Sequence, residues 1–167
     1  MSKNIRLARI EDKKKILSVI GSYRHQWDKD FAKRYYDDYF NTNTGLSKRD
    51  RVYVLTDDEE LLGVIGCCPD YYESDHNYWL GWFYIHSQYK KRGYGRQLLD
   101  HVIEEMKKLN INKPKDKKVK KLFVNTSSDE TYNRALKLYL KRGFKKVAQI
   151  KDYYGKGEHQ IILSINI

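Results

Sequence analysis

The segment from His86 to Leu99, HSQYKKRGYGRQLL, holds the residues whose types and spacing best suit chemistry. Two glycines, Gly93 and Gly95, stand in a K-x-x-G-x-G pattern where an apolar run gives way to a helical pattern. Glycine lets the backbone adopt a positive φ and approach a ligand closely. The first turn of a helix adds unpaired N–H groups and the positive end of the helix dipole. The segment therefore predicts an anion site suited to a diphosphate.

Basic side chains surround this turn, and they are Lys90, Lys91, Arg92 and Arg96. A plain turn also explains a lone G-x-G before a helix. A Rossmann dinucleotide site needs a third glycine, but Leu98 stands at that position, and the sequence has no Walker A motif. The residues alone thus indicate a phosphate-bearing ligand without naming it.

The elements that position the turn follow from hydrophobic periodicity. Residues 78–85, YWLGWFYI, are apolar without alternation, which predicts a strand buried on both faces just before the turn. A helix is predicted to begin at about Gly95. Its apolar stripe at helical spacing consists of Leu98, Leu99, Val102, Ile103 and Met106.

The rest of the chain alternates between strand and helix patterns. Strands are predicted near residues 5–9, 52–56, 61–68, 119–125, 144–150 and 160–167, and helices near 11–20, 30–40 and 127–142. Ser127 and Glu130 suggest a capping box for the last helix, and Gly143 a left-handed C-cap. Residues 153–157 are predicted to form the final turn. We expect a single mixed α/β domain over residues 1–167.

Composition bounds the class of protein. A chain of 167 residues with 40% apolar and 14% aromatic residues is one ordinary domain, not a disordered chain. A net charge of +11 raises nucleic acid, anionic membrane or a phosphorylated ligand as partners. The basic run at residues 113–121 contains Pro114 and is interpreted as a solvated loop. Because no groove-entering motif is present, we do not expect a nucleic-acid partner.

The two cysteines, Cys67 and Cys68, are adjacent in the sequence. Neighbouring cysteines rarely pair, and the spacing is not that of a metal site, so reduced thiols and no bound metal are expected. The first residues carry no apolar signal segment, and no stretch is apolar enough to cross a membrane. We therefore expect a cytoplasmic protein without a membrane partner.

At the glycine-containing turn the sequence resembles the GNAT superfamily of N-acetyltransferases. The residues from Lys90 to Gly95 are similar to the family's R/Q-x-x-G-x-G/A, with lysine keeping the charge but losing the planar fork of arginine. A second segment, YNRALKLYLKRGF, resembles the family's later helix, and the opening IRLARIEDKKKI resembles its first strand and helix. The residues of the second segment that match are Asn133, Ala135, Tyr139, Gly143 and Phe144.

This resemblance implies a twisted mixed sheet of about seven strands with helices on both faces. Strands four and five would part at one end and admit the pantetheine of acetyl-CoA. It implies that Asn133 binds the pantetheine arm and that Tyr139, as general acid, protonates the leaving thiolate. Backbone amides near Phe83, Tyr84 and Ile85 would hold the pantetheine and polarise the acyl carbonyl. The diphosphate would be held by Lys90, Lys91, Arg92, Gly93, Tyr94, Gly95 and Arg96.

The general base stays open, because the predicted fourth strand carries no carboxylate. Glu73, Asp75, His76, His86 and a water chain are the alternatives. The resemblance also suggests two groups of side chains beside the acceptor cleft, although ordinary packing is the favoured explanation for each. These side chains are Trp27, Tyr35, Tyr36 and Tyr39 near the start, and Tyr153, Tyr154 and Glu158 near the end.

The function implied is transfer of an acetyl group from acetyl-CoA to a primary amine, of a small molecule or a protein, by direct attack in a ternary complex. The alternative is a catalytically silent acyl-CoA sensor of the same fold, and a nucleic-acid binder ranks third. The resemblance leaves a homodimer open. Neither the acceptor amine nor the acyl-chain length follows from the sequence.

Overall fold

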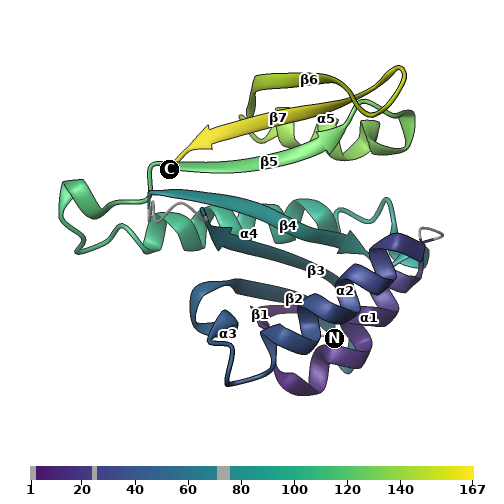
Figure 1. The fold of residues 1–167 in the computed structure, drawn as a ribbon. Coiled ribbons are helices and arrows are strands. Elements are labelled where there is room, and N and C mark those ends of the chain that lie inside the picture. Colours follow the sequence, from purple (N-terminus) through teal and green to yellow (C-terminus); the bar gives the residue numbers. More distant parts are fainter. Residues whose placement is uncertain (1–2, 24–25, 71–75) are drawn as a thin grey trace. The chain divides into compact units, whose positions relative to one another are not determined.

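The computed structural model of the protein describes residues 3–23, 26–70 and 76–167, and for residues 26–28 it describes the backbone alone. Helices and strands are interspersed along the chain (Figure 1). In chain order they are β1 (Lys3–Leu7), α1 (Lys13–Gly21), α2 (Gln26–Tyr39), α3 (Leu46–Arg49), β2 (Arg51–Asp57), β3 (Glu60–Pro69), β4 (Asn77–Ile85), α4 (Tyr94–Lys108), β5 (Lys121–Ser127), α5 (Asn133–Lys141), β6 (Lys145–Gly155) and β7 (Glu158–Asn166).

The strands form one seven-stranded sheet in the order β1-β2-β3-β4-β5-β7-β6. β4 and β5 pair in parallel, whereas β1–β2, β2–β3, β5–β7 and β6–β7 pair antiparallel. The predicted mixed α/β sheet of about seven strands is therefore confirmed. The chain divides into two compact units, one of residues up to Cys68 with Gly81–Val102 and one of Pro69–Leu80 with Ile103–Ile167.

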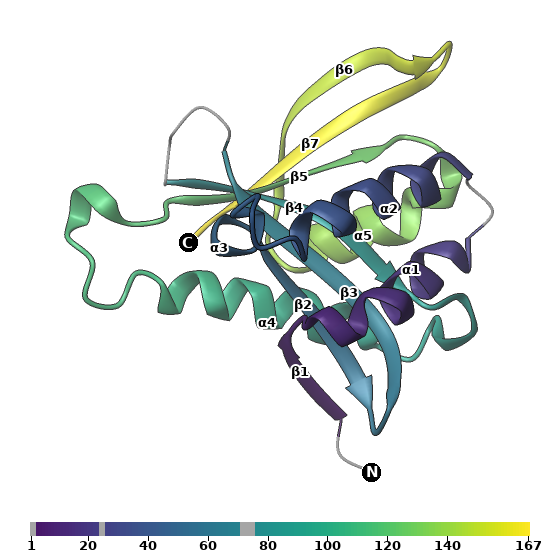
Figure 2. The ribbon, with the colours of Figure 1, turned by 60° about the horizontal axis from the view of Figure 1, so that its bottom comes forward.

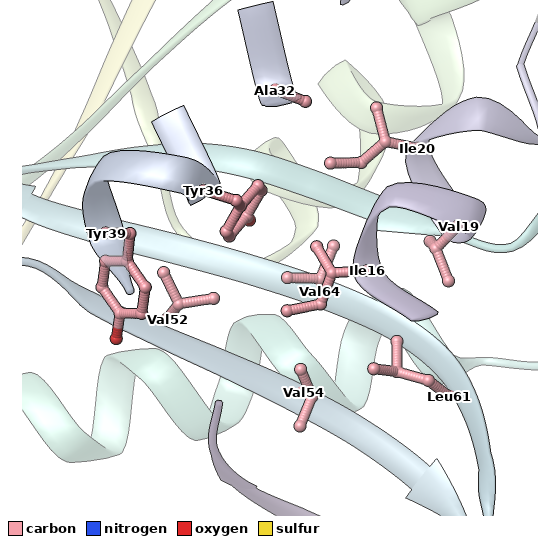
Figure 3. Packing of buried hydrophobic residues seen from close by; sticks show 10 residues of the cluster. All are labelled: Ile16, Val19, Ile20, Ala32, Tyr36, Tyr39, Val52, Val54, Leu61 and Val64. Carbon is pink, nitrogen blue, oxygen red and sulfur yellow. The ribbon is translucent and has the colours of Figure 1, made fainter. Parts of the chain in front are cut away.

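In the first unit, α1 and α2 cover one face of β2 and β3 (Figure 2). The predicted apolar face of α1 is confirmed, since Ile16, Val19 and Ile20 are buried and Leu17 is half-buried. Each such aliphatic side chain contributes about 1.5–3 kcal/mol when it leaves water. Figure 3 shows the side chains that gather between these helices and strands. They are Ile16, Val19, Ile20, Ala32, Tyr36, Tyr39, Val52, Val54, Leu61 and Val64.

The opposite face of β2 meets α4. Side chains alternate along a strand, so Tyr53 points away from the face of Val52 and Val54. There its ring lies 5.0 Å from that of His101 on α4. The five residues of the predicted stripe on α4 are all buried. Helices on both faces of the sheet, as expected, follow from these contacts.

In the second unit, β6 and β7 form a long hairpin (Figure 2), and β7 pairs with β5. The turn is shorter than predicted, because Gly155 pairs with Glu158 and leaves a loop of only two residues. Gly157 has a φ of 85°, which a two-residue hairpin loop favours. Tyr153 and Tyr154 therefore belong to β6, not to the turn.

The capping box predicted at Ser127 is wrong. Ser127 is the last residue of β5, and its Oγ donates to a carboxylate oxygen of Glu158 at 2.5 Å. Asp129 caps instead, accepting a hydrogen bond from the Thr131 N–H at 2.8 Å. A 3₁₀ turn at Glu130–Tyr132 precedes α5, so Ser127 lies too far upstream to cap that helix.

Two other local predictions are confirmed. Gly143 follows α5 with a φ of 88°, as a left-handed C-cap requires. The basic run connects α4 to β5, and its lysines are exposed except for the half-buried Lys113, although Lys121 already belongs to β5. Asn110 closes the base of this loop by hydrogen bonds to both the N–H and the C=O of Val119, at 2.7 and 2.8 Å.

The expectation that β4 is buried on both faces is wrong. Among its residues only Leu80 is buried, Gly81 is exposed and the others are half-buried. The run is rich in Tyr and Trp, whose large side chains are often only partly buried, but Phe83 and Ile85 are half-buried as well. Such a run indicates a strand correctly but overstates its burial.

Cys67 and Cys68 are free thiols on β3, as predicted. Within the described ranges, no helix is long and apolar enough to cross a membrane. The same residues contain no group of three or more His, Cys, Asp or Glu side chains that could hold a metal ion.

Candidate active site

The backbone of β4 leaves the extended conformation at Trp82, which has a φ of 49°. A bulky residue with positive φ is strained and persists only where its surroundings hold it. The Trp82 ring packs at 5.2 Å from the ring of Tyr35 and at 5.8 Å from that of Tyr36, both on α2. The three residues after this break are Phe83, Tyr84 and Ile85, whose amides the sequence analysis singled out.

Two of these three residues present their backbone groups away from β3. The His86 N–H donates to the Leu62 carbonyl of β3 at 2.9 Å. Because backbone groups alternate sides along a strand, the N–H groups of Ile85 and Phe83 point away from β3, whereas Tyr84 faces it. The Phe83 and Ile85 amides thus lie on the side of β4 opposite β3, and the binding role of all three amides stays a prediction.

Glycines of β3 lie where β4 comes close. A Cβ built on Gly63 would lie 2.9 Å from the Tyr84 carbonyl oxygen and would also meet the Ile85 Cδ1. A Cβ on Gly66 would lie 3.3 Å from the carbonyl oxygen of Gly81. Glycine at these positions thus permits close approach on either side of the strained residue.

A 3₁₀ turn at Ser87–Tyr89 connects β4 to the predicted phosphate loop, Lys90–Arg96, which leads into α4. Lys91 and Gly93 have φ values of 67° and 81°, a left-handed backbone of the kind found in anion-binding nests. A Cβ added at Gly93 would meet no atom within 4 Å. The basic side chains of the loop, Lys90, Lys91, Arg92 and Arg96, are exposed.

α4 begins at Tyr94, one residue before the predicted start. Its first intrahelical hydrogen bond runs from the Gln97 N–H to the Gly93 carbonyl, at 3.2 Å. The N–H groups of Tyr94, Gly95 and Arg96 therefore have no acceptor within the helix. Open space at Gly93, exposed cations and these N–H groups fit a CoA diphosphate.

Asn133 and Tyr139 belong to the second unit. Asn133 is the first residue of α5 and is exposed. Tyr139 is 4% exposed, and its ring lies 5.6 Å from that of Phe144. Burial raises the pKa of Tyr139 above its ordinary value, so its phenol keeps its proton throughout the neutral range.

The structure describes two of the side chains that were considered for the general base, His76 and His86. Glu73 and Asp75 lie outside the described residues. The His86 Nδ1 accepts from the Gln88 N–H at 3.4 Å, so a neutral His86 carries its proton on Nε2. The His76 Nδ1 lies 2.8 Å from the Lys118 carbonyl and must donate to it, which leaves the Nε2 of neutral His76 as an acceptor.

α2 packs three of its aromatic side chains, those of Tyr35, Tyr36 and Tyr39, in or against the core. Tyr36 is fully buried and Tyr39 is 4% exposed, both within the core cluster. The Tyr35 hydroxyl donates to the buried carboxylate of Asp50 at 2.9 Å. Burial, with the neighbouring charge of Asp50, raises the pKa of Tyr35 far above its ordinary value. The side chain of Trp27, which was grouped with these tyrosines, lies outside the described residues.

The family model for the acetyltransferase (GNAT) domain matches residues 48–146, more than half of the chain. The chain belongs to the GNAT acetyltransferase family. Its match includes β4, the phosphate loop and α5. No curated protein sequence matches the chain.

Solved structures of GNAT proteins share the fold over nearly the whole chain. A GNAT-family protein from Desulfovibrio desulfuricans is 20% identical with a TM-score of 0.85, covering 99% of both chains. The ribosomal-protein-S18-alanine N-acetyltransferase of Escherichia coli is 21% identical with a TM-score of 0.74, covering 99% of this chain and 94% of its own. An IAA acetyltransferase from Bacillus cereus is 18% identical with a TM-score of 0.68, covering 99% and 100%. At these identities the likeness shows the fold alone.

Several features of the site escaped sequence reasoning. The left-handed Trp82 has no signal, because tryptophan does not favour that conformation. Gly63 and Gly66 did have one, since isolated glycines in a strand pattern indicate a close backbone approach. No local sequence motif predicted the hydrogen bonds that join the end of α1 to the end of β4.

Proposed function

We propose that the protein transfers an acetyl group from acetyl-CoA to a primary amine by direct attack within a ternary complex. The observation that carries this proposal is the loop from Lys90 to Arg96, where two left-handed residues, exposed cations and a helix N-terminus follow the strained strand β4. Residues 1–167 would make up one GNAT domain. The cytoplasmic location and a homodimer stay predictions.

In this mechanism the diphosphate is held by the loop and the first turn of α4, through backbone N–H groups and the charges of Lys90, Lys91, Arg92 and Arg96. The pantetheine would follow the edge of β4, on the side to which the N–H groups of Phe83 and Ile85 point. One of them polarises the thioester carbonyl, as donors aimed at a developing oxyanion do. Asn133 would hydrogen-bond the pantetheine arm.

The chemical step forms a C–N bond and breaks a C–S bond. The neutral amine attacks the carbonyl carbon, and the tetrahedral intermediate collapses with loss of the CoA thiolate. Tyr139 then supplies a proton to the sulfur, since its phenol is protonated at neutral pH. The proton of the amine leaves to a base that we do not assign.

One observation favours a second candidate, a silent acyl-CoA sensor of the same fold. β4, from Asn77 to Ile85, carries no carboxylate that could serve as base. The sensor would keep the diphosphate loop and lack turnover.

A thermal melt with acetyl-CoA, free CoA and NAD, followed by a thiol-release assay on an amine panel, separates these functions. A ligand that binds only the folded state raises the melting temperature. We expect both CoA species, but not NAD, to stabilise the protein, with thiol release when an accepted amine is present. Stabilisation without release across the panel would favour the sensor. If neither CoA species stabilised the protein, the interpretation of the loop would be wrong.

A further inference from the structure

Tyr23, just after α1, contacts the C-terminal end of β4. Its hydroxyl donates a hydrogen bond to the Ile85 carbonyl at 2.7 Å. Its ring meets that of Tyr84 edge-on, with centroids 5.4 Å apart and planes at 72°. This hydroxyl therefore holds the Ile85 carbonyl on the side of β4 that points away from β3.

Ser22 makes a parallel attachment. Its Oγ accepts from the Ser87 N–H at 3.0 Å and donates to the Val19 carbonyl in α1 at 2.6 Å. On the other side, the His86 N–H is bonded to Leu62 of β3. Three consecutive residues before the phosphate loop are thus held alternately by the segment after α1 and by β3. They are Ile85, His86 and Ser87.

The ring of Tyr23 also supports Lys90 of the phosphate loop. The Lys90 ammonium lies 4.1 Å from the centre of this ring, well inside the range of a cation–π interaction. Lys90 is otherwise exposed, and a free lysine side chain loses much rotamer entropy when it is ordered. Contact with the Tyr23 ring therefore orders the Lys90 side chain before a ligand binds, and it keeps the Lys90 charge beside the end of β4.

We propose that Tyr23 is a positioning residue for the acyl-CoA diphosphate, acting through Lys90, and that this inference rests on the proposed function. A lysine stands where the family prefers arginine or glutamine, and it lacks their planar, directional donors. The Tyr23 ring instead fixes the orientation of the Lys90 side chain. The Tyr23 hydroxyl has a separate task, which is to hold the Ile85 carbonyl.

The test is a double-mutant cycle on the full chain, with CoA affinity measured by titration calorimetry. Tyr23→Leu should weaken CoA binding by about threefold to tenfold, the range expected when one long side chain must be ordered on binding. In a Lys90→Met background Tyr23→Leu should weaken CoA binding no more than Tyr23→Phe does, because both variants lack the hydroxyl. Tyr23→Phe keeps the ring and should keep the affinity within about twofold.

Phe31→Leu is the matched control, because Arg34 lies 5.0 Å over the Phe31 ring elsewhere in the first unit. It removes a similar cation–π pair and should leave CoA affinity unchanged. Circular dichroism confirms that each variant is folded.

An equal loss from Tyr23→Leu in both backgrounds would show a merely structural role and overturn the inference. Raised affinity would mean that the ring withholds Lys90 from the ligand, which would overturn it as well. A folded wild type that does not bind CoA would refute the proposed function and this inference with it. Wild-type binding with no Tyr23–Lys90 coupling would refute the inference alone.

Discussion

Replacing Gly93 by aspartate tests the diphosphate loop most sharply. The residue has a φ of 81°, and an added Cβ would meet no protein atom within 4 Å. The substitution therefore produces no clash in the ligand-free protein. Its cost to folding is the left-handed backbone, about 1 kcal/mol for a non-glycine residue. In a chain of this size that lowers the melting temperature by about 2–4 °C.

The effect on CoA binding should be much larger. A carboxylate about 6 Å from one phosphate charge repels it by roughly 0.7 kcal/mol at a dielectric constant of 80 and by about 2.8 kcal/mol at 20. With about two charges on the diphosphate, even the weaker repulsion doubles to about 1.4 kcal/mol, and 1.36 kcal/mol corresponds to tenfold in affinity. We expect Gly93→Asp to weaken CoA binding by at least about tenfold, measured by titration calorimetry.

Gly45→Asp is the matched control for this variant. Gly45 has a φ of 67°, and an added Cβ there also meets nothing within 4 Å. It lies before α3, outside the predicted loop, so it carries the same backbone cost without the charge near the ligand. Unchanged CoA affinity in folded Gly93→Asp, or an equal loss in both variants, would refute the assignment of the loop.

Three further substitutions probe the site and the fold. Tyr139→Phe should lower kcat about a hundredfold and leave CoA affinity unchanged, and an unaffected kcat would exclude the acid role. In the wild type, ionisation of this buried phenol should cause no loss of kcat below about pH 10. Gly63→Ala places a Cβ 2.9 Å from the Tyr84 carbonyl oxygen and should lower the free energy of unfolding in urea by about 1–3 kcal/mol. An unchanged free energy of unfolding would mean that β4 shifts to accommodate the methyl group without cost. Asp12→Asn should cost about 1–3 kcal/mol at pH 7, because the carboxylate, 6% exposed, accepts two hydrogen bonds from Arg6. That difference should shrink in urea titrations below about pH 4, and a gap that persisted there would contradict the charge pairing.

The direction of the pH effect on Asp12 follows from its surroundings. Burial by itself would raise the pKa of Asp12, but the hydrogen bonds from Arg6 and from the Arg9 N–H, with the charges of both arginines, lower it below its ordinary value. A carboxyl with a lowered pKa in the folded state stabilises the protein above its unfolded pKa. This stabilisation is lost as the pH falls through the folded pKa.

Periodicity predicted the elements well because burial imposes it. The stripe of α4 and the face of α1 each face a sheet, so their spacing is dictated by the core. Local features set by hydrogen bonds were harder, as the failed capping box at Ser127 shows. A serine three residues before a glutamate fits a cap, but it also fits the end of a strand that bonds to the neighbouring hairpin, and only the fold decides.

The candidate site divides in the same way. The phosphate loop is contiguous, so its glycines and cations were visible in one segment. The orientation of the Phe83 and Ile85 amides depends on the register with β3, and the contact of Tyr23 with Lys90 joins residues far apart in the sequence. The spacing of residues in the sequence does not reveal contacts of this kind, and for the same reason it does not identify the base that accepts the amine proton.

The measurement that tests the central claim most directly follows the acetyl group itself. The protein is incubated with acetyl-CoA carrying a deuterated acetyl group and a pool of amines, and the products are analysed by mass spectrometry alongside the thiol released. We predict that the label appears on an amine nitrogen in an amount equal to the free CoA formed. Released thiol with the label only in acetate, or CoA binding without label transfer to any amine in a broad pool, would contradict the account.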